Sequence, residues 1–376
     1  MKIVFLVSSM HAGGAERVAA TLASAWAERG DEVTLVATYS GRGECFYPLS
    51  DKVKILWLAD ALGPKTHPFI YGPRKLMALR RLLRQEQADV IVSFLTNVNV
   101  TALIASRGLG QPIIVCERTN PAFSSSSGAL LRRLRRITYP CADLVTLQAE
   151  ESVATFKKMV PRLKGLAVVP NPMPPPLLDA TLADPIEPAQ GRFRLMAMGR
   201  LVPDKQFSIL INAFAAVADK YPQWDLVVWG DGPLRETLTE QINHLGLGAR
   251  VTLPGRTAEP WKELAGSHAF AMSSVVEGFP NVLLEAMALG LPCITFDCPS
   301  GPREMTRDGR DALLIPLGDE DAYRRGLAKL LAEPALRSQL GRQAAQSVRE
   351  RYTLTAVLAR WDELFARVTK TSSPTE

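Results

Sequence analysis

The sequence predicts an α/β protein built from two doubly wound domains that face a central cleft. Its 376 residues correspond to two domains of ordinary size, at about 150 residues each. Hydrophobic residues make up 47% of the chain and charged residues 22%, which is typical of globular proteins and excludes disordered and collagen-like chains. Alternating strand and helix patterns occur in two blocks on either side of a proline-rich stretch, and repeated β-α-β units form parallel sheets.

The first block opens with a β-α-β unit. An apolar strand at residues 3–7 is followed by a loop, a helix that ends at Gly30 and a second apolar run at residues 33–37. Further buried strands are predicted at residues 53–58, 90–94, 113–116, 144–147 and 167–169. These elements define a first domain at residues 1–170.

Prolines crowd residues 171–191 and block both helix and central strand, so this stretch is predicted to link the domains. The alternation restarts in a second domain at residues 192–350. Its strands are predicted at residues 194–198, 225–229, 251–253, 269–272 and 292–296, and its helices near 207–221, 234–245, 260–264 and 281–289. Residues 351–376 are expected to hold a C-terminal helix able to cross back to the first domain, followed by a disordered tail.

The net charge of +6 is unevenly distributed. Up to residue 170 the chain has 22 Lys and Arg against 13 Asp and Glu, and beyond it 22 against 25. A basic first half and a mildly acidic second half indicate that one domain meets an anionic surface or a phosphorylated ligand. Charge alone also leaves nucleic acid open.

Several classes of site are disfavoured by residue usage. The five cysteines are odd in number and contain no C-x-x-C, which argues against a disulfide framework or a zinc site. The four histidines are scattered, and residues 319–321 suit a helix N-terminus better than a metal site. No apolar run reaches the roughly 18 residues of a membrane span, and the first residues lack a secretory core. We therefore expect a cytoplasmic, metal-free protein.

The loop between the first strand and the first helix contains Gly13 and Gly14. Two glycines let backbone N–H groups approach a ligand, and a helix N-terminus favours phosphate or a reacting anion. A tight turn also uses glycine for structural reasons alone, and the spacing is not the G-x-G-x-x-G of dinucleotide sites. His11 is close enough to this loop to touch a substrate, although an ordinary loop histidine is the simpler interpretation.

The corresponding turn of the second domain contains Gly199, Arg200 and Lys205. Gly199 ends a strand, and the two cations flank a short loop at the edge where a parallel sheet opens into its crevice. Two cations at this edge fit a diphosphate. The alternative is that both are solvated surface residues.

Two carboxylates, Glu277 and Glu285, surround the predicted start of a further helix. Glu277 lies in the loop beside Gly278, and Glu285 lies about one turn into the helix that begins near Pro280 and Asn281. Each carboxylate can accept hydrogen bonds from vicinal hydroxyls, one pair on a sugar ring and one on a ribose. A capping carboxylate with a surface glutamate is the structural alternative.

Taken together, these motifs resemble those of the family 4 retaining glycosyltransferases, which have the GT-B fold of two Rossmann-like domains. The resemblance rests first on Gly-Arg-Leu with Lys205 and on the spacing from Glu277 to Glu285. It extends over nearly the whole chain through residues 13–17, 169–171, 229–233, 253–256, 300–304 and 314–316. More narrowly, residues 92–99, 117–121 and 298–304 are similar to bacterial transferases that add N-acetylgalactosamine or a related hexose to undecaprenyl-diphosphate-linked oligosaccharides.

This resemblance implies roles for individual residues. Arg200 and Lys205 would neutralise the charge that grows on the leaving diphosphate, and Glu277 would contact the transferred sugar, so these three are the candidate catalytic residues. The implied donor-binding residues are Gly13, Gly14, Gly199, Gly278, Phe279, Asn281 and Glu285, with Glu285 on the ribose hydroxyls. No cofactor or metal is implied, because the nucleotide sugar is itself a substrate.

The first domain departs from the family where its members often carry a histidine near the acceptor. This chain has Glu117-Arg118-Thr119-Asn120 there. Glu117, Arg118 and His11 are therefore the acceptor-side candidates. A buried ion pair between Glu117 and Arg118 is the structural alternative.

Two predicted helices of the first domain combine leucines with arginines. At residues 130–137 the apolar residues form one stripe with arginines around it, and residues 73–84 repeat this composition. The candidate membrane contacts are Arg132, Arg133, Arg135 and Arg136, each contributing about 1 kcal/mol near an anionic leaflet. The alternative is that the stripes face the core and the arginines face water.

The favoured hypothesis is a retaining, metal-independent glycosyltransferase on the inner face of the cytoplasmic membrane. It would move a hexose or N-acetylhexosamine, with N-acetylgalactosamine as first choice, from a UDP-sugar to an undecaprenyl-diphosphate-linked oligosaccharide in surface polysaccharide or glycan assembly. No nucleic acid partner is expected. The alternatives are a sugar-nucleotide epimerase on a related scaffold and a non-catalytic basic module that binds membrane or nucleic acid.

Overall fold

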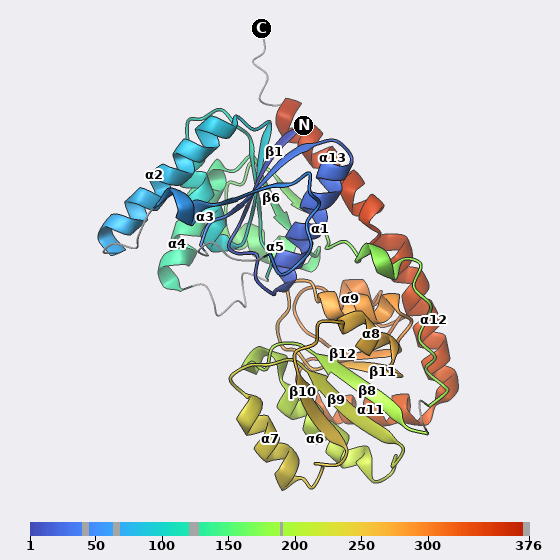
Figure 1. Ribbon diagram of the computed structural model, residues 1–376. Helices are drawn as coiled ribbons and strands as arrows, with labels where there is room; N and C mark the ends of the chain where they lie inside the picture. The colour runs from blue at the N-terminus through green and yellow to red at the C-terminus, as the bar shows by residue number, and fades with distance from the viewer. Residues whose placement is uncertain (40–44, 63–67, 120–127, 189–190, 371–376) are drawn as a thin grey trace. The chain divides into compact units, whose positions relative to one another are not determined.

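The chain divides into two compact units (Figure 1). The computed structural model describes residues 1–39, 45–62, 68–119, 128–188 and 191–370. Unit 1 comprises Met1–Asn171 and Thr355–Glu376, and unit 2 comprises Pro172–Leu354. Each unit has its own parallel sheet between helices. The predicted α/β fold class with two Rossmann-like domains is confirmed.

Unit 1 is built on a seven-stranded parallel sheet with the order β3-β2-β1-β4-β5-β6-β7. Its strands are β1 (Lys2–Val7), β2 (Glu32–Ala37), β3 (Lys54–Trp57), β4 (Val90–Phe94), β5 (Ile113–Cys116), β6 (Leu144–Leu147) and β7 (Leu166–Val168). In the central strand β1, Ile3 pairs with Val33 of β2 on one side and with Val90 of β4 on the other. These strands are continuous apolar runs because helices cover both faces of the sheet.

The helices of unit 1 lie on the two faces of this sheet. They are α1 (Gly14–Glu28), η1 (Leu58–Ala61), α2 (Pro68–Glu86), α3 (Thr96–Ser106), α4 (Ala129–Thr138), η2 (Tyr139–Cys141) and α5 (Glu151–Met159). Figure 1 shows α2, α3 and α4 side by side on one face and α1 on the other. Neighbouring residues of β1 divide accordingly: Val4 and Leu6 belong to the core under α2–α4, whereas Phe5 contacts Trp26 of α1.

The last helix, α13 (Leu354–Lys370), packs within unit 1. The rings of Trp361 and Phe365 each lie 5.4 Å from the ring of Trp26 on α1. All three side chains are buried. The end of the chain is thereby fixed to the first unit, while residues 371–376, where a disordered tail is expected, lie outside the described residues.

Unit 2 has a six-stranded parallel sheet with the order β10-β9-β8-β11-β12-β13. Its strands are β8 (Phe193–Met198), β9 (Trp224–Trp229), β10 (Val251–Gly255), β11 (Ala269–Met272), β12 (Cys293–Asp297) and β13 (Leu313–Pro316). The sequence did not predict β13. Its last residue, Pro316, favours a loop assignment, yet proline is tolerated here because β13 is an edge strand.

The helices of unit 2 surround its sheet. They are η3 (Pro175–Leu177), η4 (Pro203–Lys205), α6 (Phe207–Ala218), α7 (Arg235–His244), α8 (Pro260–Ala265), α9 (Asn281–Ala288), α10 (Pro302–Met305), α11 (Glu320–Ala332) and α12 (Pro334–Arg351). The proline-rich stretch packs onto this unit. Met173 and Leu177 are buried in its core, and the Met173 N–H donates to the Tyr352 carbonyl at 2.7 Å. The stretch expected to link the domains is therefore held firmly by unit 2.

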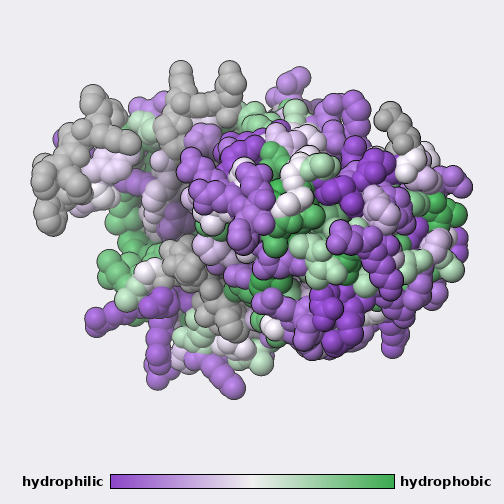
Figure 2. All heavy atoms as spheres, turned by 90° about the horizontal axis from the view of Figure 1, so that it is seen from below, coloured by the Kyte–Doolittle hydropathy of each residue, from purple (hydrophilic) through white to green (hydrophobic). Residues whose placement is uncertain are grey.

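The surface is mixed in character. Figure 2 shows a face on which hydrophilic side chains predominate, with hydrophobic ones between them. Within the described residues no helix combines the length and the hydropathy needed to cross a bilayer. Over the same residues no cluster of His, Cys, Asp and Glu is arranged to hold a metal ion, and the five cysteines are free thiols.

Candidate active site

Lys205 and Glu277 meet at the carboxyl end of the unit 2 sheet. Lys205 ends the short helix η4 after β8, and Glu277 lies in the loop after β11. Because β8 and β11 are neighbouring parallel strands, their carboxyl ends emerge side by side. The Lys205 Nζ donates to Glu277 Oε1 at 2.5 Å, with 23% of the lysine side chain and 11% of the glutamate side chain exposed.

Backbone contacts fix these two loops to each other. The Val275 N–H donates to the Asp204 carbonyl at 2.9 Å, and Ser273 Oγ donates to the Lys205 carbonyl at 2.8 Å. The geometry of the Lys205–Glu277 pair is therefore set by main-chain bonds as well as by charge. Arg200, the other candidate for the diphosphate, is exposed on the same loop.

Two glycines after β9 let the loop after β8 pack against the loop after β9. The Gly199 N–H donates to the Trp229 carbonyl at 2.9 Å. Gly230 has a φ of +139°, and a Cβ there would lie 1.8 Å from the Gly199 carbonyl oxygen. A Cβ on Gly232 would lie 2.6 Å from the Leu201 carbonyl oxygen. In the sequence, Gly230 and Gly232 stand out only as part of the family resemblance over residues 229–233. The structure shows that neither position has room for a Cβ, because the backbone of the neighbouring loop lies too close.

The loop after Glu277 leads directly into helix α9. Pro280 is the residue before the helix, and Gly301, with a φ of +102°, packs so closely that a Cβ would lie 2.8 Å from Pro280 Cδ. The Phe279 side chain is buried edge-on against Tyr352, with 5.4 Å between ring centroids. The aromatic ring thus anchors the loop, so any contact of Phe279 with a ligand involves its backbone. Gly278 and Asn281 are partly exposed on either side.

Glu285 lies on α9 and is 1% exposed. The Trp261 indole Nε1 of α8 donates to its Oε2 at 3.2 Å. A carboxylate taken out of water requires such donors. Trp261 was absent from the sequence-based candidates, because nothing in the local pattern links it to a residue 24 positions away.

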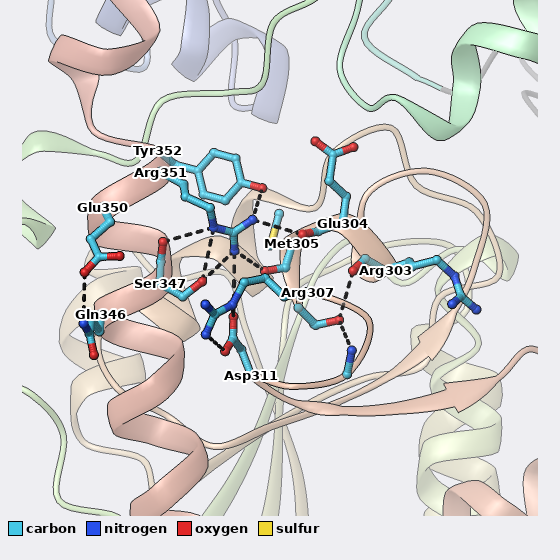
Figure 3. Close-up of polar contacts among 12 residues, drawn as sticks. Arg303, Glu304, Met305, Arg307, Asp311, Gln346, Ser347, Glu350, Arg351 and Tyr352 are labelled. Atoms are coloured by element: carbon cyan, nitrogen blue, oxygen red, sulfur yellow. Dashed lines mark hydrogen bonds and ion pairs between the residues drawn. The ribbon is translucent and has the colours of Figure 1, made fainter.

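A polar network around Arg351 and Tyr352, at the end of α12, supports α10 (Figure 3). Arg351 donates to the carbonyls of Glu304 at 3.0 Å and Met305 at 2.6 Å, the last two residues of α10. It also donates to the Tyr352 hydroxyl at 3.0 Å. Asp311, fully buried, receives two hydrogen bonds from Arg307. Arg351 and Tyr352 therefore hold α10 and Phe279 in place.

In unit 1 the glycine loop is covered by a carboxylate of the chain itself. Gly13 precedes α1, and a Cβ on it would lie 2.2 Å from Glu16 Oε2. Ser9 Oγ donates to the other Glu16 oxygen at 3.1 Å. An anion at Gly13 and Gly14 has to displace this carboxylate. His11 is exposed in the loop before them.

Glu117 belongs to a buried polar network of unit 1. It is 2% exposed and accepts hydrogen bonds from Thr96 Oγ1 at 2.8 Å and from the Tyr139 hydroxyl at 2.5 Å. Arg135 Nη1 lies 3.8 Å from its Oε1. Burial raises the pKa of Glu117. The structural alternative, an ion pair between Glu117 and Arg118, is wrong in its partner, because the arginine beside Glu117 is Arg135.

Arg118 points to different partners. Its Nη2 donates to Asn171 Oδ1, and its guanidinium lies over the Phe94 ring at 4.1 Å from the centroid. Arg118 is 9% exposed. Burial lowers its pKa to about 10, so the group stays charged at neutral pH.

Helix α4 presents a mixed surface. Leu131 and Leu134 pack on the core, while Leu130 and Ile137 are 71% and 61% exposed. Arg132, Arg133 and Arg136 are exposed as well. Arg135 is 1% exposed. The expectation that Arg135 contacts a membrane is wrong, because its guanidinium points inward to Glu117.

Comparisons with known proteins match both units. Residues 13–172 match the family described as Glycosyl transferase 4-like domain, and residues 181–347 match Glycosyl transferases group 1. An uncharacterized glycosyltransferase of Methanocaldococcus jannaschii is 30% identical over 272 residues, 68% of this chain and 67% of the relative. The chain belongs to the family 4 glycosyltransferases.

Two further proteins are similar to this glycosyltransferase over nearly its whole length. The Campylobacter jejuni GalNAc-alpha-(1->4)-GalNAc-alpha-(1->3)-diNAcBac-PP-undecaprenol alpha-1,4-N-acetyl-D-galactosaminyltransferase is 28% identical over 374 residues, 98% of this chain and 99% of the relative. Among solved structures, Anabaena HepE in complex with UDP and glucose superposes with a TM-score of 0.81 at 21% identity, covering 97% of this chain and 99% of that one. The structural likeness shows the GT-B fold.

Proposed function

We propose that this glycosyltransferase moves a hexose or N-acetylhexosamine, with N-acetylgalactosamine as first choice, from a UDP-sugar to an undecaprenyl-diphosphate-linked oligosaccharide. The observation that carries the proposal is the contact between Lys205 and Glu277 at the carboxyl edge of the unit 2 sheet. The names of the two proteins above support it, since the C. jejuni relative acts on an undecaprenol-linked glycan and HepE binds UDP and glucose.

The paired charges suggest how a donor would bind. Glu277 Oε1 is paired with the Lys205 ammonium at 2.5 Å. A diphosphate carries more negative charge than one carboxylate, so it replaces Glu277 on Lys205 and draws in the exposed Arg200. Glu277, released from the lysine, then accepts hydrogen bonds from hydroxyls of the sugar. Donor binding and sugar recognition are coupled through one lysine.

The same cations would assist the reaction. The bond between the anomeric carbon and the phosphate oxygen breaks, and the acceptor oxygen bonds to that carbon on the same face, which retains the configuration. The acceptor hydroxyl proton passes to the departing phosphate. Charge that grows on UDP is stabilised by Lys205 and Arg200, both of which contact the diphosphate once the donor is bound. These groups supply the positive charge that a metal ion would otherwise provide, so the reaction needs no metal.

The surface of α4 supports a membrane location for the acceptor. Leu130 and Ile137 are exposed beside Arg133 and Arg136. Apolar side chains flanked by arginines suit the interface of an anionic leaflet. The protein would then meet its lipid-linked acceptor on the inner face of the cytoplasmic membrane.

The test is a transfer assay with the purified chain, UDP-N-acetylgalactosamine and an undecaprenyl-diphosphate oligosaccharide in the presence of a chelator. A product one N-acetylhexosamine longer, with an α-linkage by NMR, is expected. Conversion of the UDP-sugar without acceptor would instead indicate an epimerase. Absence of transfer from every UDP- and GDP-hexose would refute the proposal.

A further inference from the structure

Three side chains of unit 1 converge at the carboxyl ends of three neighbouring strands. Strands β5, β6 and β7 are consecutive in the sheet and parallel. Arg118 follows β5 by two residues, Gln148 follows β6 by one and Asn171 follows β7 by three. The carboxyl edge of a parallel sheet is where such folds bind ligands.

The contacts among these side chains are specific. Arg118 Nη2 and Gln148 Nε2 both donate to a single oxygen, Asn171 Oδ1, the second at 2.7 Å. All three residues are at least nine-tenths buried, with 9%, 5% and 3% of their surface exposed. One carboxamide oxygen thus holds an arginine and a glutamine side by side.

Two of the polar atoms in this cluster have no hydrogen-bond partner in the part of the chain that the structure describes. Arg118 Nε and Gln148 Oε1 are buried, and neither makes a hydrogen bond with any described residue. Arg118 Nε belongs to the guanidinium whose Nη2 donates to Asn171, and Gln148 Oε1 belongs to the carboxamide whose Nε2 donates to Asn171. Both atoms therefore lie near the Asn171 carboxamide. Leaving such atoms without a partner is costly in a folded protein.

The guanidinium of Arg118 has no ion-pair partner among the described residues. Across the described residues no carboxylate lies within ion-pair distance of its guanidinium, whose contacts are the Asn171 amide oxygen and the Phe94 ring. Buried Arg135, by contrast, is close to Glu117. A buried cation without an anion is unfavourable unless a ligand supplies the negative charge.

We propose that Arg118, Gln148 and Asn171 form a binding site for a sugar phosphate. The Arg118 Nε–H donates to a phosphate oxygen, and Gln148 Oε1 accepts from a hydroxyl or amide N–H of the sugar. Both the donor and the acceptor of the proposed reaction contain a phosphorylated sugar. We assign the site to the acceptor, because Lys205 and Arg200 of unit 2 already serve the donor diphosphate. This inference rests on the proposed function.

The variant Gln148→Glu tests the site with little change of shape. It sets a carboxylate beside the Arg118 guanidinium, where it competes with the ligand phosphate and neutralises the buried charge. We expect the KM for the diphosphate-linked acceptor to rise by about tenfold or more, while the KM for the UDP-sugar stays within about twofold. Because the variant also replaces the Nε2 donor to Asn171 Oδ1 by an oxygen, the unfolding midpoint is measured alongside to show that the variant is folded. An unchanged acceptor KM would overturn the proposal.

Gln111→Glu is the matched control. Gln111 precedes β5 at the opposite edge of the sheet and also has a buried Oε1 without a hydrogen bond among the described residues. This variant should leave both KM values unchanged. If it raises the acceptor KM as much as Gln148→Glu does, the effect is a general response to buried charge and the assignment fails.

A binding measurement decides the site independently of transfer. N-acetylglucosamine 1-phosphate, N-acetylglucosamine and inorganic phosphate are titrated calorimetrically into the full chain and into Gln148→Glu. The sugar phosphate should bind the unchanged chain most tightly and lose about tenfold in affinity in the variant. Equal affinity for inorganic phosphate would refute the sugar contact, and equal affinity in both proteins would refute the site. If the chain transfers no sugar yet this binding pattern holds, the proposed function fails while the site stands.

Discussion

Lys205 Nζ lies 2.5 Å from Glu277 Oε1, so two side chains 72 positions apart in the sequence form one ion pair at the edge of the unit 2 sheet. Both are partly buried. The pair joins the residue assigned to the donor diphosphate with the residue assigned to the transferred sugar. Substitution of either side chain should therefore affect recognition of both parts of the donor.

Lys205→Ala should abolish most transfer while the protein stays folded. Loss of one fixed charge that stabilises a leaving group costs about a hundredfold or more in kcat. Steady-state transfer assays with circular dichroism as a check on folding measure this. Lys262→Ala, which removes an exposed lysine paired with Glu259, serves as the control and should keep normal turnover. Normal turnover in Lys205→Ala would disprove the diphosphate assignment.

Gly230→Ala should disrupt the loop that carries Arg200. The added Cβ would overlap the Gly199 carbonyl, and the φ of +139° is strained for alanine. We expect a loss of more than about 2 kcal/mol in the free energy of unfolding and weaker UDP binding. Gly246→Ala also replaces a glycine with a positive φ, here +68°, but nothing lies within 4 Å of the added Cβ. It should cost about 1 kcal/mol and bind UDP normally, and equal behaviour of the two variants would contradict the packing argument.

Trp261→Phe should weaken donor binding by removing the indole donor to Glu285. Loss of a hydrogen bond to a buried carboxylate should raise the KM for the UDP-sugar by about tenfold, with a smaller effect on kcat. Trp224→Phe offers a comparison, because its buried indole Nε1 makes no hydrogen bond to a described residue. That variant should lose stability alone. An unchanged KM for the UDP-sugar in Trp261→Phe would show that Glu285 does not take part in donor recognition.

The stability of unit 2 should fall as the pH drops below about 6.5. The Arg194 N–H donates to His268 Nδ1 at 2.8 Å, so that nitrogen has to be unprotonated. Burial lowers the pKa of His268 from 6.5. As the pH falls, His268 of the unfolded chain therefore takes up a proton at a higher pH than His268 of the folded chain. The free energy of unfolding is fully present above pH 6.5 and falls between pH 6.5 and the lower pKa of the folded state, by up to about 1 kcal/mol per pH unit.

Urea unfolding at pH 7.5 and 5.5 measures this loss. His268→Asn keeps an acceptor for the Arg194 N–H but does not titrate, so its stability should change less over the same interval. Equal pH dependence in the two proteins would rule out His268 as the cause.

Reversing two exposed charges of α4 should weaken membrane binding. The double variant Arg133→Glu and Arg136→Glu removes two cations beside Leu130 and Ile137, and we expect at least about a tenfold loss of affinity for anionic vesicles. Flotation with vesicles of defined anionic lipid content measures this. Arg310→Glu, at an exposed position of unit 2, should bind as the unchanged chain does. Unaltered vesicle binding of the double variant would exclude α4 as the membrane contact.

The sequence was most informative where local pattern decides structure. Continuous apolar runs located β1 and β4, and their alternation with helices predicted the parallel sheets. The spacing of Gly199, Lys205 and Glu277 indicated the donor loops, since residues after parallel strands meet at one edge. The structure brings Lys205 and Glu277 together, while their roles stay predictions.

Long-range pairing could not be read in the same way. The periodicity of apolar residues identifies α4 as an amphipathic helix. It does not show that the Arg135 side chain is buried, because its partner Glu117 comes from a different element. The orphan atoms of Arg118 and Gln148 likewise depend on Asn171, which is distant in sequence from both. Strand β13 was not predicted either, and its last residue, Pro316, is compatible with a strand because β13 lies at the edge of the sheet.

Calorimetric titration of the purified chain with UDP and GDP, first with a chelator and then with magnesium, measures whether Lys205 binds the donor diphosphate. We expect micromolar binding of UDP without metal, no gain from magnesium, and a large loss of affinity in Lys205→Ala. Failure of UDP to bind under either condition, or equal binding by Lys205→Ala, would contradict this expectation.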